Sequence, residues 1–152
     1  MTAWRFARLD GLTAREVHDI LQARSAVFVV EQACVFQDMD GADVAGWHLF
    51  ARADDARIAA YCRLLPAGLA FAEPSIGRVI TTAAARGTGL GRALLAESLA
   101  RAAALWPGTP IRIGAQRYLE RFYGDFGFVQ ASEPYDEDGI AHIEMLRPGD
   151  SP

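Results

Sequence analysis

The chain has 152 residues, of which 51% are hydrophobic and 22% are charged, and its formal net charge at pH 7 is −4. This length and composition predict one globular domain over residues 1–152, with enough apolar side chains for a buried core. The acidic balance argues against a nucleic-acid partner, because such a surface needs clustered positive charge. All fifteen basic residues are arginines, so the chain contains no lysine.

The sequence also argues against a membrane span and a metal site. No stretch approaches the roughly 18 consecutive apolar residues of a membrane-spanning helix, so we expect a cytoplasmic protein with no membrane partner. The two cysteines, Cys34 and Cys62, have no CxxC spacing and no obvious histidine partners. They predict reduced, partly buried thiols and no bound metal.

The first part of the chain predicts a strand followed by a capped helix. Alternating residues indicate a strand at 4–9. Thr13 and Glu16 have the spacing of a capping box, and apolar residues then recur near the helical period as far as about Val30. Residues 33–43, ACVFQDMDGAD, predict a loop or a short second helix.

The rest of the chain alternates short apolar runs with two helices, the first of which is amphipathic. The expected strands are 47–53, 58–65, 75–82, 109–115, 128–132 and 140–146, and the expected helices are 89–106 and 118–127. Residues 135–139, YDEDG, predict a turn between the last two strands. The central order of strand, glycine loop, helix and strand predicts an α/β domain with at least one parallel crossover.

Residues 86–95 read RGTGLGRALL and place three glycines on alternate positions before a leucine-rich helix. A glycine loop that opens a helix directs backbone N–H groups and the positive end of the helix dipole at one point, which makes an anion socket. A P-loop would need a lysine, which the chain lacks. A dinucleotide fold would need an acidic residue about 20 positions after its GxGxxG motif. No Asp or Glu lies between Glu97 and Glu120.

The hexapeptide that begins at Arg86 and ends at Gly91 resembles the pyrophosphate loop, [QR]xxGx[GA], of the GNAT superfamily of N-acetyltransferases, which bind acetyl-coenzyme A. FYGDFGF at 122–128 resembles a second GNAT block, one strand further along the chain. VFVVEQ, DMDGAD, IGRVI, GAQ and YDEDGIAHI resemble the ElaA-like branch in their order, across nearly the whole chain.

The resemblance implies a GNAT fold, with a mixed, mostly antiparallel central sheet of six to seven strands and flanking helices. In that fold the sheet splays between the two strands that hold the cofactor. The implied cofactor is acetyl-coenzyme A, as acetyl donor: a strand end would pair with the pantetheine arm, the loop N–H groups would hold the pyrophosphate, and Gln116 would replace an asparagine of many relatives. The implied cofactor-binding residues are Val79, Ile80, Thr81, Arg86, Gly87, Thr88, Gly89, Leu90, Gly91, Arg92 and Gln116.

Tyr123 is the implied catalytic residue, because it matches the position from which many GNAT enzymes protonate the departing coenzyme A thiolate. A free tyrosine has a pKa of about 10 and a free thiol a pKa of about 8.5, so the phenol is protonated at pH 7 and can share its proton with the thiolate. The structural alternative is a tyrosine packed in the core between Phe122 and Phe126.

The general base is not assigned by the sequence. An alkyl ammonium with a pKa near 10.4 must lose a proton before it can attack a thioester at about pH 7. Some relatives carry a glutamate on the strand that reads TPIRIG here, and this strand has no acid. The substitutes that remain open, directly or through water, are Glu31, His48, Glu144 and His142.

The acceptor pocket of such proteins is built from the first helix, the loop after it and the final strands. The implied acceptor-binding residues are Arg24, Glu31, Gln32 and His142. Arg24 either has this role or snorkels from the edge of the core. The acidic loop with Asp38, Asp40 and Asp43 either favours a cationic, amine-bearing acceptor or is a solvated surface.

Three functions therefore remain open. The first is an enzyme that transfers acetyl from acetyl-coenzyme A to a primary amine of a small molecule or peptide by direct attack. The second, suggested by the missing acid, is a GNAT fold that binds coenzyme A or an acyl derivative as a sensor and transfers nothing. The third is acyl transfer that makes a signalling lactone, suggested by the first-helix Arg and VFV pattern. A homodimer is compatible with all three.

Overall fold

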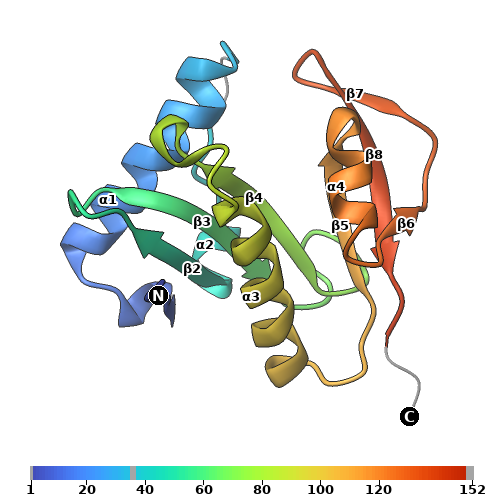
Figure 1. Cartoon of the computed structure of the whole chain (residues 1–152). Coiled ribbons are helices and arrows are strands. Elements are labelled where there is room, and N and C mark those ends of the chain that lie inside the picture. Colours follow the sequence, from blue (N-terminus) through green and yellow to red (C-terminus); the bar gives the residue numbers. More distant parts are fainter. Residues whose placement is uncertain (1, 35–36, 150–152) are drawn as a thin grey trace.

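The computed structural model describes residues 2–34 and 37–149, which form one sheet with helices on both faces (Figure 1). The strands are β1 Arg5–Arg8, β2 Trp47–Arg52, β3 Ile58–Leu65, β4 Ser75–Thr81, β5 Ile111–Gln116, β6 Val129–Gln130, β7 Tyr135–Glu137 and β8 Ile140–Arg147. The helices are α1 Ala14–Arg24, α2 Ala42–Ala45, α3 Leu90–Leu105 and α4 Glu120–Gly124, with the 3-10 turns η1 Leu9–Gly11, η3 Ala83–Ala85 and η4 Arg117–Leu119 and the π-helix η2 Ser25–Glu31. Among the described helices none is long and apolar enough to cross a membrane.

The sheet is mixed and mostly antiparallel, as the sequence predicts. Its strand order is β1-β2-β3-β4-β5-β8-β6, with β7 also paired to β8, and β4 and β5 run parallel. The sheet has eight strands, one more than expected, because β7 forms where a turn was predicted. The turn itself occupies only Asp138 and Gly139, whose φ angles are 54° and 80°. Two positive φ angles in a two-residue loop match the twist of a hairpin, so the flanking residues can pair.

The predicted capping box is confirmed at the start of α1. The Thr13 hydroxyl accepts a hydrogen bond from the Glu16 N–H at 3.0 Å, and the Glu16 carboxylate accepts one from the Thr13 N–H at 2.8 Å. The helix extends about as far as predicted, but after Arg24 it widens into the π-helix η2. Within 33–43 the only helical residues described belong to α2, and residues 35 and 36 of that prediction lie outside the described part of the chain.

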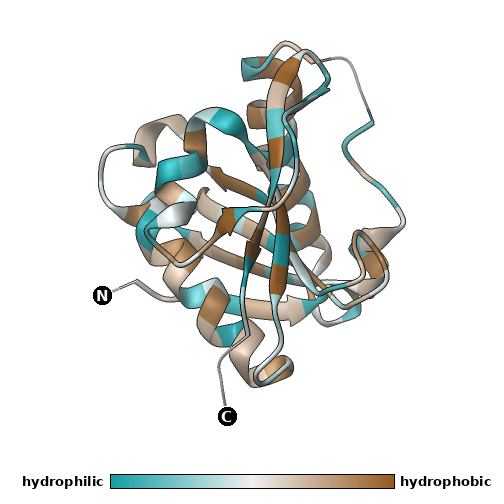
Figure 2. Cartoon of the chain, turned by 90° about the vertical axis from the view of Figure 1, so that its right-hand side faces the viewer, coloured by the Kyte–Doolittle hydropathy of each residue, from teal (hydrophilic) through white to brown (hydrophobic). Residues whose placement is uncertain are grey.

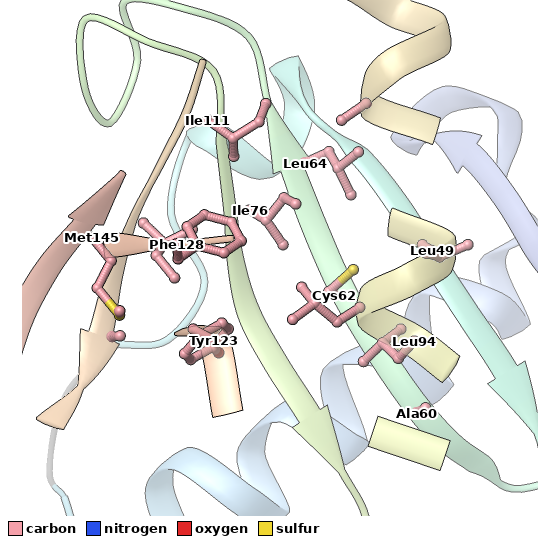
Figure 3. Packing of buried hydrophobic residues seen from close by; sticks show 14 of the residues in the cluster. Leu49, Ala60, Cys62, Leu64, Ile76, Leu94, Ile111, Tyr123, Phe128 and Met145 are labelled. Carbon is pink, nitrogen blue, oxygen red and sulfur yellow. The ribbon is translucent and has the colours of Figure 1, made fainter. Parts of the chain in front are cut away.

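Helices cover both faces of the sheet, and β3 is buried along its whole length. Successive strand residues point to opposite faces, so Cys62 packs toward α3 and α4 whereas Tyr61 packs toward α1 and η2. Figure 3 shows the first of these clusters, with Tyr123 beside Phe128. Figure 2 shows apolar residues concentrated on the central strands.

The sheet opens between β4 and β5 (Figure 1). Ser75 and Arg112 are the single pair in register between these strands, whereas β5 pairs with β8 from Ile111 to Gln116. The predicted splay between the two cofactor strands is therefore confirmed. The gap that it leaves is the site described next.

Candidate active site

A cavity of about 690 Å³ lies where β4 and β5 separate. Its walls come from η2, β4, β5, the η4–α4 segment and the β7–β8 hairpin. Nine of the predicted site residues line it: Glu31, Gln32, Val79, Ile80, Thr81, Arg86, Gln116, Tyr123 and His142. Arg24 and residues 87–92 of the glycine loop are not part of this lining.

The edge of β4 that faces the cavity carries backbone groups without a strand partner. Beyond Ser75, no residue of β4 pairs with β5 in the described chain. A β-bulge also interrupts the pairing of β4 with β3, and Arg78 within it has a φ of 50°. Backbone groups on an open edge need hydrogen-bond partners, so the edge can accept an extended ligand as an additional strand. The predicted pairing of residues 79–81 with a pantetheine arm fits this geometry.

The start of α3 has the geometry of an anion socket. Gly87 and Gly89 have φ angles of 81° and 83°, in the left-handed region that favours glycine, and Gly89 is the N-cap. In contrast to α1, no side chain caps α3. The first N–H groups of a helix have no intrahelical acceptor and lie at the positive end of its dipole, so these donors are available to a phosphate. The loop therefore fits a pyrophosphate group.

Arg92, in the first turn of α3, is held against α4. Its guanidinium forms an ion pair with Asp125 at 2.8 Å and lies over the rings of Phe122 and Phe126. These contacts connect the glycine loop to the helix that carries Tyr123. A role of Arg92 at the pyrophosphate stays a prediction, because the guanidinium has these other partners.

Arg86 and Glu31 meet across the lining of the cavity. The Arg86 Nη2 donates to Glu31 Oε1 at 2.7 Å, and its Nε donates to the carbonyl oxygen of Thr81 at 3.1 Å. The side chains retain 45% and 37% of their exposure, so the pair is partly solvated. It joins the end of η2 to the loop that follows β4.

Tyr123 is both a core residue and a cavity residue. Its ring makes edge contacts with Phe122 and Phe128. The core alternative placed it between Phe122 and Phe126, and in the structure Phe128 takes the place of Phe126. Among the described residues its hydroxyl makes no hydrogen bond, and the side chain lines the cavity. Burial raises the pKa of Tyr123 well above its usual value. The phenol therefore keeps its proton throughout the neutral range, as a general acid requires.

The opposite wall of the cavity comes from β5 and the β7–β8 hairpin. Gln116 ends β5 directly across from His142 on β8. The Nδ1 of His142 bonds the carbonyl of Ile140 at 2.7 Å, its Nε2 lies 3.3 Å from a carboxylate oxygen of Glu137, and its ring stacks on Tyr135. The imidazole is therefore held in a fixed orientation at the cavity wall.

Two of the four proposed general bases do not line the cavity. His48 is buried, with its Nδ1 2.6 Å from the Tyr61 hydroxyl and its Nε2 2.9 Å from the carbonyl of Asp43. Burial lowers its pKa below the usual value. Glu144 is paired with Arg112 at 3.1 Å and is not one of the lining residues. Glu31 and His142 are the two candidates that remain at the cavity.

Arg24 packs differently from the snorkelling alternative. It is fully buried, so it does not reach solvent, and it is not part of the lining of the cavity. A role of Arg24 in acceptor binding stays a prediction. Its Nε donates to Asp38 Oδ2 at 2.7 Å and its Nη1 donates to Asp43 Oδ1 at 2.8 Å. A buried guanidinium needs carboxylate partners. The loop supplies them by folding inward, which a sequence pattern does not reveal.

The acidic loop is therefore solvated only in part, because Asp38 and Asp43 are buried whereas Asp40 stays exposed. A cationic acceptor at this loop stays a prediction. Arg63 pairs with Asp40 at 2.7 Å and with Asp43 at 2.8 Å, and Arg78 pairs with Asp38 at 2.9 Å. The three carboxylates thus neutralise three arginines of the chain itself. Since Arg78 lies in the β4 bulge, this network also fixes the strand that borders the cavity.

Several cavity residues were missed by the sequence reasoning. Glu137 falls in the stretch predicted to be a turn, and Cys34 was treated only as a buried thiol; both line the cavity, with Tyr118 and Arg78. The Cys34 Sγ lies 3.4 Å from the carbonyl oxygens of Gln32 and Asp138, which connects the two walls. No local motif marked these residues, because tertiary packing brings them to the site.

The open splay, the uncapped helix start and the tyrosine at the wall are the arrangement of a GNAT domain, a family that generally uses acyl-coenzyme A. Residues 18–147 match the family model for the acetyltransferase (GNAT) domain, so the chain belongs to the GNAT family. Protein ElaA of Escherichia coli is 40% identical over 149 residues, covering 97% of each chain. The UPF0039 protein sll0451 of Synechocystis is 41% identical over 143 residues, covering 94% of this chain and 93% of the relative. The predicted ElaA-like resemblance is confirmed.

Solved structures agree with this assignment. The structure of an acyl-CoA N-acyltransferase from Pseudomonas aeruginosa superposes with a TM-score of 0.91 and 42% identity, covering 97% of this chain and 99% of the other. The structure of Escherichia coli ElaA superposes with a TM-score of 0.90 and 38% identity, covering 97% of this chain and 99% of the other. TofI, in a ternary complex with an inhibitor and MTA, gives 0.74 at 17% identity, which shows a common fold alone.

Proposed function

We propose that the protein transfers an acetyl group from acetyl-coenzyme A to a primary amine by direct attack. The observation that carries this proposal is the cavity between β4 and β5, which combines an open strand edge with Tyr123 and lies beside the uncapped start of α3. The membership of the chain in the GNAT family supports the same reaction class. A small-molecule or peptide amine, a cytoplasmic location and a homodimer remain part of the proposal.

The residues present fit the cofactor in three places. The backbone of residues 79–81 and the amide of Gln116 would hold the pantetheine arm, and the N–H groups of the glycine loop would hold the pyrophosphate. Acetyl-coenzyme A supplies an activated acetyl group as a thioester.

Tyr123 and a cavity base would handle the two protons. The Tyr123 Oη–H would donate to the sulfur of the leaving thiolate. A tyrosine is protonated at neutral pH, and burial raises the pKa of Tyr123 further, so the proton is present for transfer although the phenol is a weaker acid. The incoming ammonium group must first lose a proton, and Glu31 and His142 are the lining residues that could accept it, directly or through water. The β5 strand itself offers no carboxylate in its sequence IRIGAQ.

A thiol-release screen tests the proposal, with polyamines, amino acids, aminosugars and peptide N-termini as acceptors. We expect saturable release of coenzyme A with at least one amine, and micromolar-to-millimolar binding of coenzyme A by calorimetry. The missing acid on β5 favours one alternative, a non-catalytic sensor of coenzyme A or an acyl derivative. Tight cofactor binding without turnover of any amine would support that alternative, and a lactone product would support a signal synthase.

A further inference from the structure

The ion pair between Arg86 and Glu31 connects the glycine loop, which fits a pyrophosphate, with the wall of the cavity at the end of η2. Arg86 opens the glycine loop, next to the donors that fit a pyrophosphate. Glu31 ends η2 and lines the cavity. The Arg86 Nη2 lies 2.7 Å from Glu31 Oε1, so each side chain neutralises the charge of the other. Among the described residues, Arg86 is the only ion-pair partner of Glu31.

Competition for Arg86 follows from the strength of the contacts. A pyrophosphate carries more negative charge than a carboxylate and forms charge-assisted hydrogen bonds to a guanidinium. The side chains of Arg86 and Glu31 are 45% and 37% exposed, and an exposed pair of this kind contributes little to stability. The guanidinium can therefore leave Glu31 at little cost when a phosphate group occupies the socket beside it.

We propose that Arg86 and Glu31 form a latch that opens when coenzyme A binds, and that the released carboxylate of Glu31 then recognises the ammonium group of the acceptor. This inference rests on the proposed function. Without its partner, Glu31 is an unpaired carboxylate on the cavity wall, and a nearby ammonium group stabilises its charge. The latch thus keeps the acceptor-recognising charge neutralised until the acetyl donor is present.

Calorimetry with coenzyme A tests the first half of the latch. Because Glu31 competes with the pyrophosphate for Arg86, Glu31→Gln should bind coenzyme A about two- to fivefold more tightly than the wild type. Glu97→Gln is the matched control, because this carboxylate pairs with Arg101 at similar exposure and does not line the cavity, and it should leave the dissociation constant unchanged. In a protein that already carries Arg86→Gln, the additional Glu31→Gln substitution should leave the dissociation constant of coenzyme A unchanged.

The second half is tested with the primary amine of highest turnover in the screen. Glu31→Gln should raise the KM for this amine about threefold or more while the affinity for coenzyme A increases. A merely structural Glu31 would weaken the binding of both substrates, and thermal melting identifies any variant that does not fold. Unchanged or weaker coenzyme A binding by folded Glu31→Gln would overturn the latch. A wild type that binds no coenzyme A would instead overturn the proposed function itself.

Discussion

Arg24 donates to Asp38 at 2.7 Å where both side chains are almost inaccessible to water, at 0% and 5% exposure. The two residues lie on α1 and on the loop that leads to α2, so this contact ties the loop against the helix. Asp38 also pairs with Arg78 of the β4 bulge. A charge buried beside the sheet therefore contributes to the shape of the cavity from a position outside it.

Arg24→Met should destabilise the protein by about 3–5 kcal/mol, because it leaves the carboxylates of Asp38 and Asp43 buried without one of their cations. Urea unfolding at pH 7 measures this change. Arg5→Met is the matched control: its pair with Glu16 is largely at the surface, and its loss should cost less than about 1 kcal/mol. Equal effects of the two substitutions would contradict a buried network.

The same network predicts a loss of stability in acid. Burial alone would raise the pKa of Asp43, but hydrogen bonds from Arg24 and Arg63 outweigh burial and hold the pKa below its usual value of 3.8. A lowered pKa in the folded state adds stability that is complete above the unfolded value and is lost as the pH falls through the folded one. We therefore expect the free energy of unfolding to decrease below about pH 4.

Urea unfolding at a series of pH values checks this expectation. Asp43→Asn should make the decrease below about pH 4 shallower, because one of the groups that takes up a proton on unfolding is then missing. Asp54→Asn, at the exposed turn between β2 and β3, should leave the slope as in the wild type. An unaltered slope in Asp43→Asn would argue against the assigned role of Asp43.

Gly91 provides a test of the anion socket that keeps the fold intact. A Cβ at Gly91 would lie 3.7 Å from Thr81 Cγ2, an ordinary contact, and the residue has no positive φ. Gly91→Ala should therefore fold and bind coenzyme A much as the wild type does. The larger Gly91→Val would place methyl groups over the first donors of α3, so we expect about tenfold weaker binding or more in calorimetry. If the two variants bind coenzyme A with equal affinity, the pyrophosphate does not bind at this loop.

The sequence was informative where the signal is local. Thr13 and Glu16 predict their capping box because both partners lie within one helical turn, and the glycines at 87 and 89 predict left-handed backbone that the structure contains. The buried ion pairs of Arg24 were not predicted, because its partners lie 14 and 19 residues away on a loop without a regular pattern. β7 was read as a turn because only its pairing with β8 makes it a strand.

Self-acetylation gives a further test of direct transfer. Because the chain has no lysine, incubation with acetyl-coenzyme A should give no acetyl-lysine, and any mass gain should map to a free N-terminal amine or a cysteine. Cys62 is fully buried, and burial raises the pKa of its thiol. Cys34 lines the cavity and is the cysteine expected to react. Peptide mapping with Cys34→Ser as control checks this, and a stoichiometric acetyl group on any other side chain would exclude direct attack.

Tyr123→Phe isolates the proposed general acid. The hydroxyl makes no hydrogen bond within the described chain, so its removal should leave the ring contacts with Phe122 and Phe128 and hence the melting temperature nearly unchanged. General acid catalysis typically contributes about 10²- to 10⁴-fold. We expect kcat and kcat/KM for the amine to fall together by about tenfold or more, since the contact is made only in the transition state. The affinity for coenzyme A should stay near that of the wild type.

Tyr118→Phe is the matched control for this experiment. Tyr118 also lines the cavity, but it is 75% exposed and is not the residue that matches the acid position. Loss of the Tyr118 hydroxyl should change kcat by less than about threefold, which is below the range of general acid catalysis. Because burial raises the pKa of Tyr123, deprotonation of this phenol should not limit the wild-type rate below about pH 10. A Tyr123→Phe variant that works at the wild-type rate would make Tyr123 a packing residue and leave the thiolate to take its proton from water.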